Sequence, residues 1–237
     1  MRYKNITEAI FISRPNRFIA VVEIGGEWVT VHVKNTGRCR ELLTEGGRVF
    51  LERSENPARK TPYDLVAVIK RTESGEMFIN MDSSAPNEAV AEWLPVSGIF
   101  SPQAVFRREV THKNSRFDFY AEDGDRRAFI EVKGVTLEDR GVAYFPDAPT
   151  ERGVKHLCEL TECIAEGYEA YVIFVMQMKG IDKFRPNDAM HPQFGEALRA
   201  AADKGVNIIA VDCTVSCDEM KIDSLVETEL DIKEDKK

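Results

Sequence analysis

The segments Ser115-Arg116-Phe117-Asp118-Phe119 and Glu131-Val132-Lys133 decide the fold of this chain. Each combines apolar residues with a few charged ones, as is typical of short, half-buried strands. Because side chains alternate between the two faces of a strand, Glu131 and Lys133 point to one side and Val132 points into the core. If the two strands pair as a hairpin, Asp118 meets Glu131 on that side.

The side chains brought together in this way indicate a metal site. Two adjacent carboxylates repel each other, and a divalent cation is a natural reason to bring them together. Lys133 is then placed to stabilise an attacking hydroxide or the charge that develops on a phosphate. Such a site is equipped for metal-assisted cleavage of a phosphodiester. A simpler alternative makes Asp118 and Glu131 surface residues of a two-stranded ribbon, with Lys133 as their salt-bridge partner.

The elements expected around this motif follow the order α-β-β-β-α-β-α-β. Turn signals and apolar patterns predict helices over 87–94, 151–166 and 193–204 and strands over 105–110, 116–120, 127–133, 170–177 and 206–213. Thr150 is the expected N-cap of the second helix, and Gly167 is expected to close it. Hairpin-linked strands followed by two crossover units predict a mixed sheet with helices on both faces. This order, with an acid on the second strand and E-x-K on the third, resembles the PD-(D/E)xK nuclease superfamily, although Phe117 stands where that superfamily often has proline.

The N-terminal part of the chain has a different, all-β pattern. Five short strands are predicted over 17–24, 28–33, 48–53, 64–71 and 76–81, separated by glycine- and asparagine-containing turns. This spacing favours a small OB-like barrel, with an SH3-like barrel as the alternative. We therefore predict an α+β protein with an OB-like DNA-binding barrel over 1–84, a PD-(D/E)xK-type, restriction-endonuclease-like domain over 85–230 and a charged tail over 231–237.

Composition limits the class of function and the compartment. The chain has 237 residues and a net charge of −8, which argues against a generic cationic DNA coat. No apolar run is long enough to cross a membrane and the N-terminus lacks a signal-peptide pattern, so we expect a cytoplasmic protein without a membrane partner. The five cysteines have irregular spacing, which indicates reduced thiols, and the scattered histidines argue against a histidine-rich metal site.

Several segments together are similar to one known family. They are Arg17-Phe18-x-Ala20, Asn35-Thr36-Gly37-Arg38, the two acidic strands with Val135-Thr136-Leu137, and Phe145-Pro146-Asp147-Ala148-x-Thr150-x-Arg152-Gly153-x-Lys155-His156-Leu157-x-Glu159-Leu160. From about residue 14 to 230 the chain resembles the sugar fermentation stimulation protein A family. The resemblance implies an OB-like domain, a nuclease-like domain, nonspecific DNA binding and a regulatory link to sugar (maltose) utilisation. Cys39 stands where we expect Met or Leu, and a buried thiol can replace an apolar side chain there.

The expected metal ligands are Asp118, Glu131 and the Val132 carbonyl, with Glu109 on the preceding strand as a further candidate. These hard oxygen ligands favour Mg²⁺ or Mn²⁺ over zinc. An equally good interpretation of Glu109 is a solvated charge paired with Arg107 or Arg108. We expect Asp118, Glu131 and Lys133 to be the catalytic residues.

The expected DNA-binding residues are Arg17, Arg38, Arg116, Arg152, Lys155 and His156. Residues 152, 155, 156 and 159 share one side of the predicted helix, which either faces the site or is a solvated surface. The segment 35–38 predicts a turn with positive φ at Gly37 and a phosphate contact by Arg38, with Arg14 and Arg40 adding positive potential. The loop 144–148 either stacks on a base or packs over the helix start.

The leading functional hypothesis is DNA binding without strong sequence preference, combined with a metal site for phosphodiester hydrolysis. The alternatives are a noncatalytic DNA-binding regulator linked to sugar metabolism and a structure-specific RNA-processing nuclease. The sequence contains no helix-turn-helix with a readable recognition helix, which argues against operator-specific repression. It leaves the oligomeric state open, a homodimer included.

Overall fold

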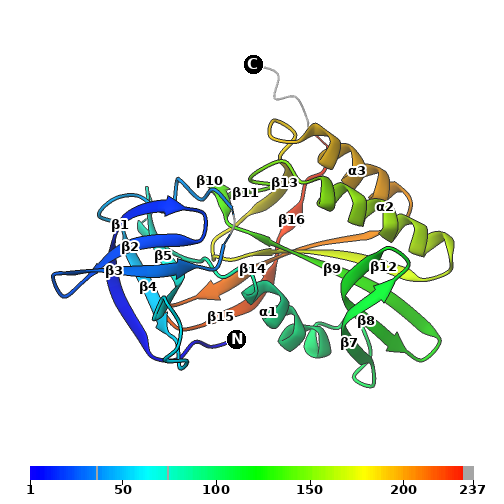
Figure 1. The fold of residues 1–237 in the computed structure, drawn as a ribbon. Helices are drawn as coiled ribbons and strands as arrows, with labels where there is room; N and C mark the ends of the chain where they lie inside the picture. Colours follow the sequence, from blue (N-terminus) through cyan, green and yellow to red (C-terminus); the bar gives the residue numbers. More distant parts are fainter. Residues whose placement is uncertain (36, 74, 232–237) are drawn as a thin grey trace, which may run out of the picture.

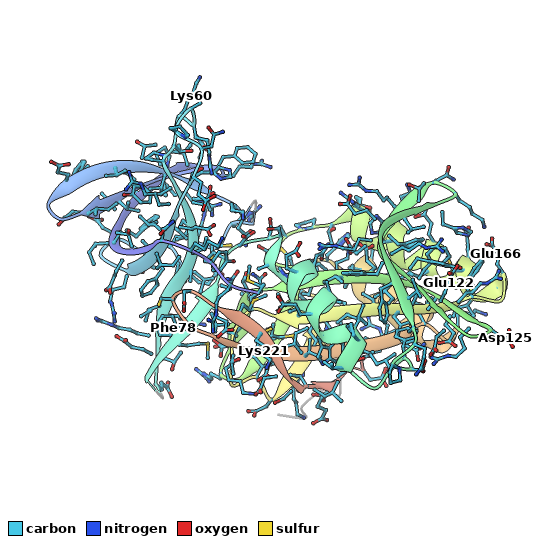
Figure 2. All side chains as sticks on the ribbon, turned by 90° about the horizontal axis from the view of Figure 1, so that it is seen from below. Lys60, Phe78, Glu122, Asp125, Glu166 and Lys221 are labelled. Atoms are coloured by element: carbon cyan, nitrogen blue, oxygen red, sulfur yellow. The ribbon has the colours of Figure 1, made fainter. Side chains whose placement is uncertain are left out.

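The computed structural model describes residues 1–35, 37–73 and 75–231 and places a β-barrel beside a larger mixed-sheet domain (Figure 1). The molecule is elongated, with Lys60 at the barrel end and Asp125 in a hairpin at the opposite end (Figure 2). Thr36, Ser74 and the end of the predicted tail, residues 232–237, lie outside the described residues.

The barrel is formed by the first six strands. They are β1 (Ile6–Asn16), β2 (Ile19–Ile24), β3 (Glu27–Val33), β4 (Arg48–Arg53), β5 (Tyr63–Thr72) and β6 (Gly75–Asn80). Their order is β3-β2-β1-β4-β5-β6, and a parallel pairing of β3 with β5 closes the sheet on itself. The interior is filled by alternating apolar side chains such as Val22, Val31 and Leu51, as expected of a small closed barrel. The predicted OB-like barrel is confirmed.

The sequence interpretation was wrong about the first strand of this barrel. β1 was not predicted, yet it lies between β2 and β4 and pairs with both. Its Ala9 and Phe11 are buried, but the strand also carries Glu8, Ser13 and Pro15, which interrupt the apolar alternation. Its pairing with β2 shifts register twice, because the long strand bends around the barrel.

The C-terminal domain is built on a second six-stranded sheet of order β15-β14-β12-β9-β8-β7. The strands are β7 (Val105–His112), β8 (Ser115–Asp123), β9 (Arg126–Val135), β12 (Glu169–Met176), β14 (Asn207–Val215) and β15 (Met220–Leu225). β9, β12 and β14 are parallel and central, and the strands outside them pair in antiparallel fashion. This confirms the predicted mixed sheet.

Helices cover both faces of that sheet, as expected (Figure 1). The helices are α1 (Ala85–Trp93), followed by the 3₁₀ turn η1 (Leu94–Val96), α2 (Glu151–Ala165) and α3 (Pro192–Asp203). Side chains of β12 alternate between two cores: Val172 and Phe174 pack on the α2–α3 side, whereas Ile173 and Val175 pack on the α1 side. A continuous apolar run therefore forms a strand that is buried on both faces.

The residues predicted to begin and end α2 do so in the structure. The Thr150 side chain accepts a hydrogen bond from the Gly153 amide at 3.1 Å and caps the helix, and Gly167 has a φ of 88° just after its end. The ring of Phe145 lies 5.5 Å from that of Phe174 and 5.0 Å from that of Phe194, which fixes it in the core. Phe145 therefore packs, as one of the two interpretations expected, but its ring contacts are with β12 and α3.

A second small sheet, which the sequence did not predict, lies beside the main one. It has the order β10-β11-β13-β16, from β10 (Leu137–Asp139), β11 (Val142–Phe145), β13 (Lys183–Pro186) and β16 (Glu227–Thr228). Strands of two to four residues carry too little alternation to be detected in a sequence. No helix in the described ranges is long and apolar enough to cross a bilayer.

Candidate functional site

Asp118 lies where two neighbouring strands separate. The register of β8 and β9 places Asp118 opposite Glu131, but the ladder between these strands ends one step earlier, at Phe119 and Ile130. The Asp118 carboxylate instead accepts a hydrogen bond from the Val132 amide, with 2.7 Å between Val132 N and Asp118 Oδ2. The side chain therefore takes the place of a ladder partner and is held at a break in the sheet.

Glu131 is buried on the α2 side of β9. Its Oε1 atom accepts hydrogen bonds from two side chains, Lys133 Nζ at 2.5 Å and His156 Nδ1. Glu131 and Lys133 share one face of the strand and Val132 is buried on the other, as the alternation predicted. The surface-ribbon alternative is wrong, because Glu131 is only 4% exposed.

The second oxygen of Glu131 has no hydrogen-bond partner among the described residues. Oε2 is fully buried and unpartnered, which is costly for an ionised carboxylate. Burial acts to raise the pKa of Glu131, but the hydrogen bond from His156 and the charge of Lys133 more than offset it and hold this pKa below its ordinary value. An ionised carboxylate with one oxygen saturated and the other free is a suitable ligand for a hard cation.

The pKa of the neighbouring carboxylate, Asp118, is shifted in the opposite direction. Burial and, after it, the charge of Glu131 raise the pKa of Asp118. Within the described ranges, no three His, Cys, Asp or Glu side chains are grouped so that they could hold a metal ion. A cation at this position would have two carboxylates as its protein side-chain ligands, with backbone, water or substrate oxygens completing its shell, a pattern common for Mg²⁺.

Asn87 is a site residue that the sequence reasoning missed. It belongs to the first turn of α1, and its Nδ2 donates to Asp118 Oδ1 at 2.7 Å. Together with the Val132 amide it fixes both oxygens of Asp118. Nothing in the local sequence marks Asn87, because its partner lies in another element and the contact is created only by the packing of α1 on the sheet.

The structure does not bring Glu109 together with Asp118 and Glu131. Glu109 lies opposite Asp118 in the register of β7 and β8, but its backbone is left-handed, with a φ of 54°. Its carboxylate is exposed and lies 3.7 Å from the guanidinium of Arg116. The exposed-charge interpretation thus describes this structure better, with Arg116 rather than Arg107 or Arg108 as the partner.

The predicted polar face of α2 divides into two parts. His156 is buried and bonded to Glu131, and its Nε2 accepts a hydrogen bond from Arg152 Nε at 3.3 Å, so the ring proton lies on Nδ1. Lys155 is exposed and donates to the Asn114 carbonyl at 3.0 Å. Gly153, His156, Leu157 and Leu160 form the buried stripe at helical spacing, a signal that could have identified His156 as an inward-facing residue.

The cysteine of α2 with the most exposed position is Cys158, whereas Cys39 is buried, as expected of a thiol in place of an apolar side chain. All five cysteines are free thiols.

Arginines of the barrel surround a cavity of about 610 Å³ on the side that meets the segment 148–149. Its lining includes Arg14, Arg17, Arg38 and Arg40. Arg14 has a structural role, because its guanidinium donates hydrogen bonds to four backbone carbonyls at 2.7 to 3.0 Å. Among the described residues, Arg17, Arg38 and Arg40 have no carboxylate partner within 4.0 Å, so an outside anion can reach their charge.

The turn formed by residues 35–38 does not have the backbone conformation that the sequence predicted. Gly37 does not have a positive φ; the left-handed residue is Cys39, with a φ of 43°. Gly37 is required for close approach, because a Cβ atom there would lie 2.5 Å from Asp147 Oδ2 and 2.9 Å from Asn35 Oδ1. The two most distinctive sequence segments, 35–38 and 145–160, therefore contact each other between the domains. Thr36 lies outside the described residues.

Comparisons with known proteins agree with this architecture. The family model described as the sugar fermentation stimulation protein RE domain matches residues 84–219, and the SfsA N-terminal OB domain matches residues 12–79. The sugar fermentation stimulation protein homolog of Ruminiclostridium cellulolyticum is 53% identical, covering 97% of this chain and 100% of its own. The homolog of Desulfitobacterium hafniense is 54% identical, covering 97% of this chain and 99% of its own.

One solved structure has the same fold over nearly the whole length. It is described as Pyrococcus furiosus SfsA in complex with Ca²⁺, and it matches with a TM-score of 0.84 and 24% identity, covering 97% of this chain and 98% of that chain. The match spans both the barrel and the mixed-sheet domain. Given these matches over both domains, the chain belongs to the sugar fermentation stimulation protein (SfsA) family.

Proposed function

We propose that this protein binds DNA without strong sequence preference and hydrolyses phosphodiester bonds at a divalent-cation site formed by Asp118 and Glu131. The observation that carries the proposal is the asymmetry of Glu131, whose Oε1 accepts two hydrogen bonds while Oε2 is buried and unpartnered. An unsatisfied oxygen on a buried, ionised carboxylate is destabilising, and a bound cation would satisfy it.

The side chains around the two carboxylates hold them in fixed orientations. Asn87 and the Val132 amide fix Asp118, and His156 fixes Glu131. A bound divalent cation supplies polarisation of phosphate oxygens and a water of lowered pKa. Lys133, whose side chain is 15% exposed, places a positive charge beside Glu131, where it stabilises the negative charge that develops on the phosphate.

The donor set favours a hard cation. Carboxylate oxygens without a cysteine, and with no histidine nitrogen left over, suit Mg²⁺ or Mn²⁺. The Pyrococcus furiosus relative was solved in complex with Ca²⁺, another cation that prefers oxygen ligands, and this supports a divalent-cation site in the family fold. Ca²⁺ accepts more ligands and a less regular geometry than Mg²⁺, so we propose Mg²⁺ or Mn²⁺ as the ion that supports hydrolysis.

The arginine cavity of the barrel supports the DNA-binding half of the proposal. In a chain with a net charge of −8, three arginines without carboxylate partners among the described residues are an unusual local concentration of available positive charge. The ring of Phe18 is 50% exposed and lies 6.0 Å from the Arg17 guanidinium, which adds a surface on which a base can stack. Arginines contacting phosphates position a strand without reading its sequence.

The proposal is tested by a cleavage panel that separates three functions. Wild type, Asp118→Asn and Lys133→Ala are incubated with single-stranded, duplex and branched DNA and with RNA, in Mg²⁺, Mn²⁺ or EDTA. We expect wild type to cut DNA in a cation-dependent manner and both variants to lose cleavage while keeping most of their DNA affinity.

Other outcomes identify the alternatives. Binding of DNA with no cation-dependent product would make the protein a noncatalytic regulator, and cleavage of RNA alone would make it an RNA-processing nuclease.

A further inference from the structure

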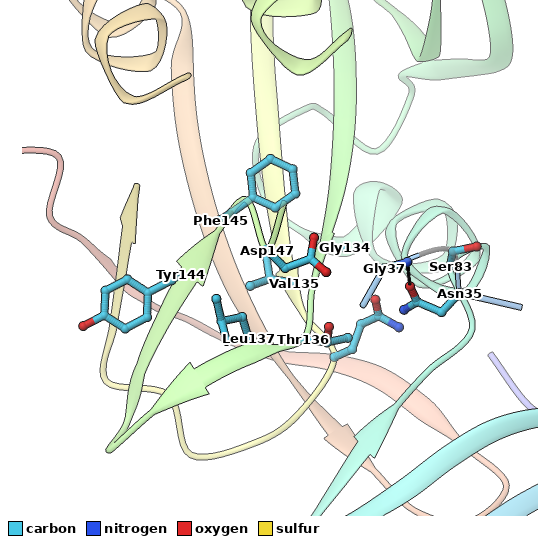
Figure 3. Close-up of a pocket in the computed structure, with 11 residues that line it drawn as sticks. Asn35, Gly37, Ser83, Gly134, Val135, Thr136, Leu137, Tyr144, Phe145 and Asp147 are labelled. Carbon is cyan, nitrogen blue, oxygen red and sulfur yellow. Dashed lines mark hydrogen bonds between the residues drawn. The ribbon is translucent and has the colours of Figure 1, made fainter. Parts of the chain in front are cut away.

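A second cavity, of about 170 Å³, lies at the contact between the barrel and the C-terminal domain (Figure 3). Its walls come from the turn at Asn35 and Gly37 on one side and from the end of β9 with the segment around Asp147 on the other. Gly134, which lines it, directly follows Lys133. Since a strand rises about 3.3 Å per residue, the cavity begins roughly 10 Å beyond Glu131.

Two glycines keep this cavity open. A Cβ atom on Gly134 would lie 2.6 Å from Gln177 Oε1 and 2.8 Å from Pro86 Cγ. A Cβ atom on Gly37 would lie 2.5 Å from Asp147 Oδ2. Any larger residue at either position would press on the polar groups that line the space, so the shape of the cavity depends on both glycines.

Gln177 presents a fixed acceptor to the cavity. Its side chain is buried, and its Nε2 donates to the Asn80 carbonyl, Asn80 Oδ1 and the Asp82 carbonyl, each at 3.0 Å. Three acceptors around one nitrogen set the orientation of the amide. Its Oε1, which faces Gly134, has no hydrogen-bond donor within the described part of the chain.

Asp147 adds a carboxylate to the same lining. No ion pair from Lys, Arg or His to this carboxylate is found among the described residues. Across from it, Asn35 uses Oδ1 to accept from the Gly37 amide at 2.8 Å. The cavity therefore offers acceptor oxygens from Gln177 and Asp147 beside the amide of Asn35, so a ligand that satisfies both oxygens must bring donors to them.

We infer that this cavity is a subsite for one unpaired nucleobase that carries an exocyclic amino group, next to the phosphodiester that the proposed function places at Glu131 and Lys133. This inference rests on that proposed function. Cytosine, adenine and guanine carry an exocyclic amino donor, whereas uracil and thymine have only the ring N3–H as a donor and present a carbonyl in place of the amino group of cytosine. The arginine cavity adjoins the subsite, because Gly37 lines both, and it offers positive charge to the phosphates of the same strand.

The consequence for the substrate is that one nucleotide beside the cut must be unpaired. A cavity of this size between two domains admits a single base and not a base pair. The preferred substrate class is therefore single-stranded nucleic acid, or a duplex from which one base has been extruded.

The test compares oligo(dC) with oligo(dU) of equal length at neutral pH in EDTA, by fluorescence anisotropy with the full-length protein. These polymers have the same phosphates, and their bases differ by the 4-amino group of cytosine and the 4-oxo group of uracil. Wild type is expected to bind oligo(dC) roughly tenfold more tightly, the value of one hydrogen bond to a charged acceptor. Asp147→Asn should remove this preference while leaving oligo(dU) binding unchanged, which also shows that the variant is folded.

Asp139→Asn is the matched control, because Asp139 is an exposed carboxylate on β10 that does not line this cavity. It should retain the full preference. Equal affinity of wild type for both polymers, or an unchanged preference in Asp147→Asn, would overturn the subsite and leave the proposed function standing. No binding to either polymer would remove the DNA-binding proposal and the subsite with it.

Discussion

The imidazole of His156 and the carboxylate of Glu131 are joined by a buried hydrogen bond between Nδ1 and Oε1. His156 is thereby a positioning residue: it lies behind the carboxylate, and Arg152 on its other nitrogen fixes the ring proton on the Glu131 side. Such outer contacts set the orientation of a metal ligand and are commonly worth a factor of about 10 to 100 in metal affinity.

The first prediction concerns that contact. His156→Ala leaves Oε1 of Glu131 with one donor fewer and opens a space under α2, so the free energy of unfolding should fall by about 1–3 kcal/mol. Mn²⁺ affinity should fall about tenfold or more. His156→Gln, which keeps a donor, should recover part of both losses, as measured by urea unfolding and calorimetry. Unchanged Mn²⁺ affinity in His156→Ala would refute the positioning role.

The second prediction concerns the cost of the paired carboxylates. Burial and Glu131 raise the pKa of Asp118, so its ionised form destabilises the metal-free protein. Asp118→Asn removes this charge but also replaces one of the two oxygens that accept from Asn87 and Val132, so it should unfold in EDTA at a temperature close to that of wild type. Added Mg²⁺ should raise the melting temperature of wild type but not that of the variant, because only a state with an intact site gains binding energy. Equal stabilisation of both proteins by Mg²⁺ would place the cation elsewhere.

The third prediction concerns the contact between the domains and its pH dependence. Lys70 Nζ on β5 donates to Glu138 Oε2 on β10 at 2.5 Å. Burial acts to raise the pKa of Glu138, but hydrogen bonds from Lys70 and the Gly141 amide more than offset it and lower the pKa. Because the pKa of Glu138 is lower in the folded state than in the unfolded state, its ionised form stabilises the fold. This stabilisation is fully present above the unfolded pKa of about 4.3 and is lost as the pH falls through the folded pKa.

Glu138→Gln tests this linkage. Near neutral pH it should lower the free energy of unfolding by about 1–3 kcal/mol, and the difference from wild type should shrink in acid as the wild-type carboxylate is protonated. Urea unfolding across the acid range measures it. A difference that grows in acid would contradict the assigned sign.

The fourth prediction concerns DNA affinity. Arg17→Ala and Arg38→Ala should each reduce the salt dependence of duplex binding, lowering the slope of log K against log salt by about 0.9 for each phosphate that the protein no longer neutralises. Arg53→Ala is the control, because Arg53 is an exposed arginine of the same barrel that does not line the arginine cavity. If Arg17→Ala, Arg38→Ala and Arg53→Ala all show the same slope as wild type, the arginine cavity is not the phosphate-binding surface.

The sequence predicted the chemistry on β8 and β9 better than the contacts that support it. Strand alternation alone places Glu131 and Lys133 on one face, because the period of two depends only on the backbone. The contact of Asn87 with Asp118 depends instead on how α1 packs across the sheet, which no local pattern specifies. Glu109 was a candidate because it lies on the strand before the acidic pair, but its backbone is left-handed and its carboxylate is exposed beside Arg116.

The remaining differences in the fold have the same origin. β10, β11, β13 and β16 are too short for a periodic signal, and they are held by pairing with distant segments. The predicted role of Gly37 was wrong for a related reason: the glycine is required by the approach of Asp147 from the other domain, and the turn itself does not need it.

The most direct test of the central claim, that Glu131 and Asp118 hold a divalent cation, is a calorimetric titration of Mn²⁺ into wild type, Glu131→Gln and Glu109→Gln. Glu131→Gln preserves the shape of the side chain but removes its charge, whereas Glu109 is exposed and paired with Arg116. We expect a Mn²⁺ site in wild type, a loss of binding by at least about 100-fold in Glu131→Gln and little change in Glu109→Gln. Equal Mn²⁺ affinity in wild type and Glu131→Gln would contradict the account.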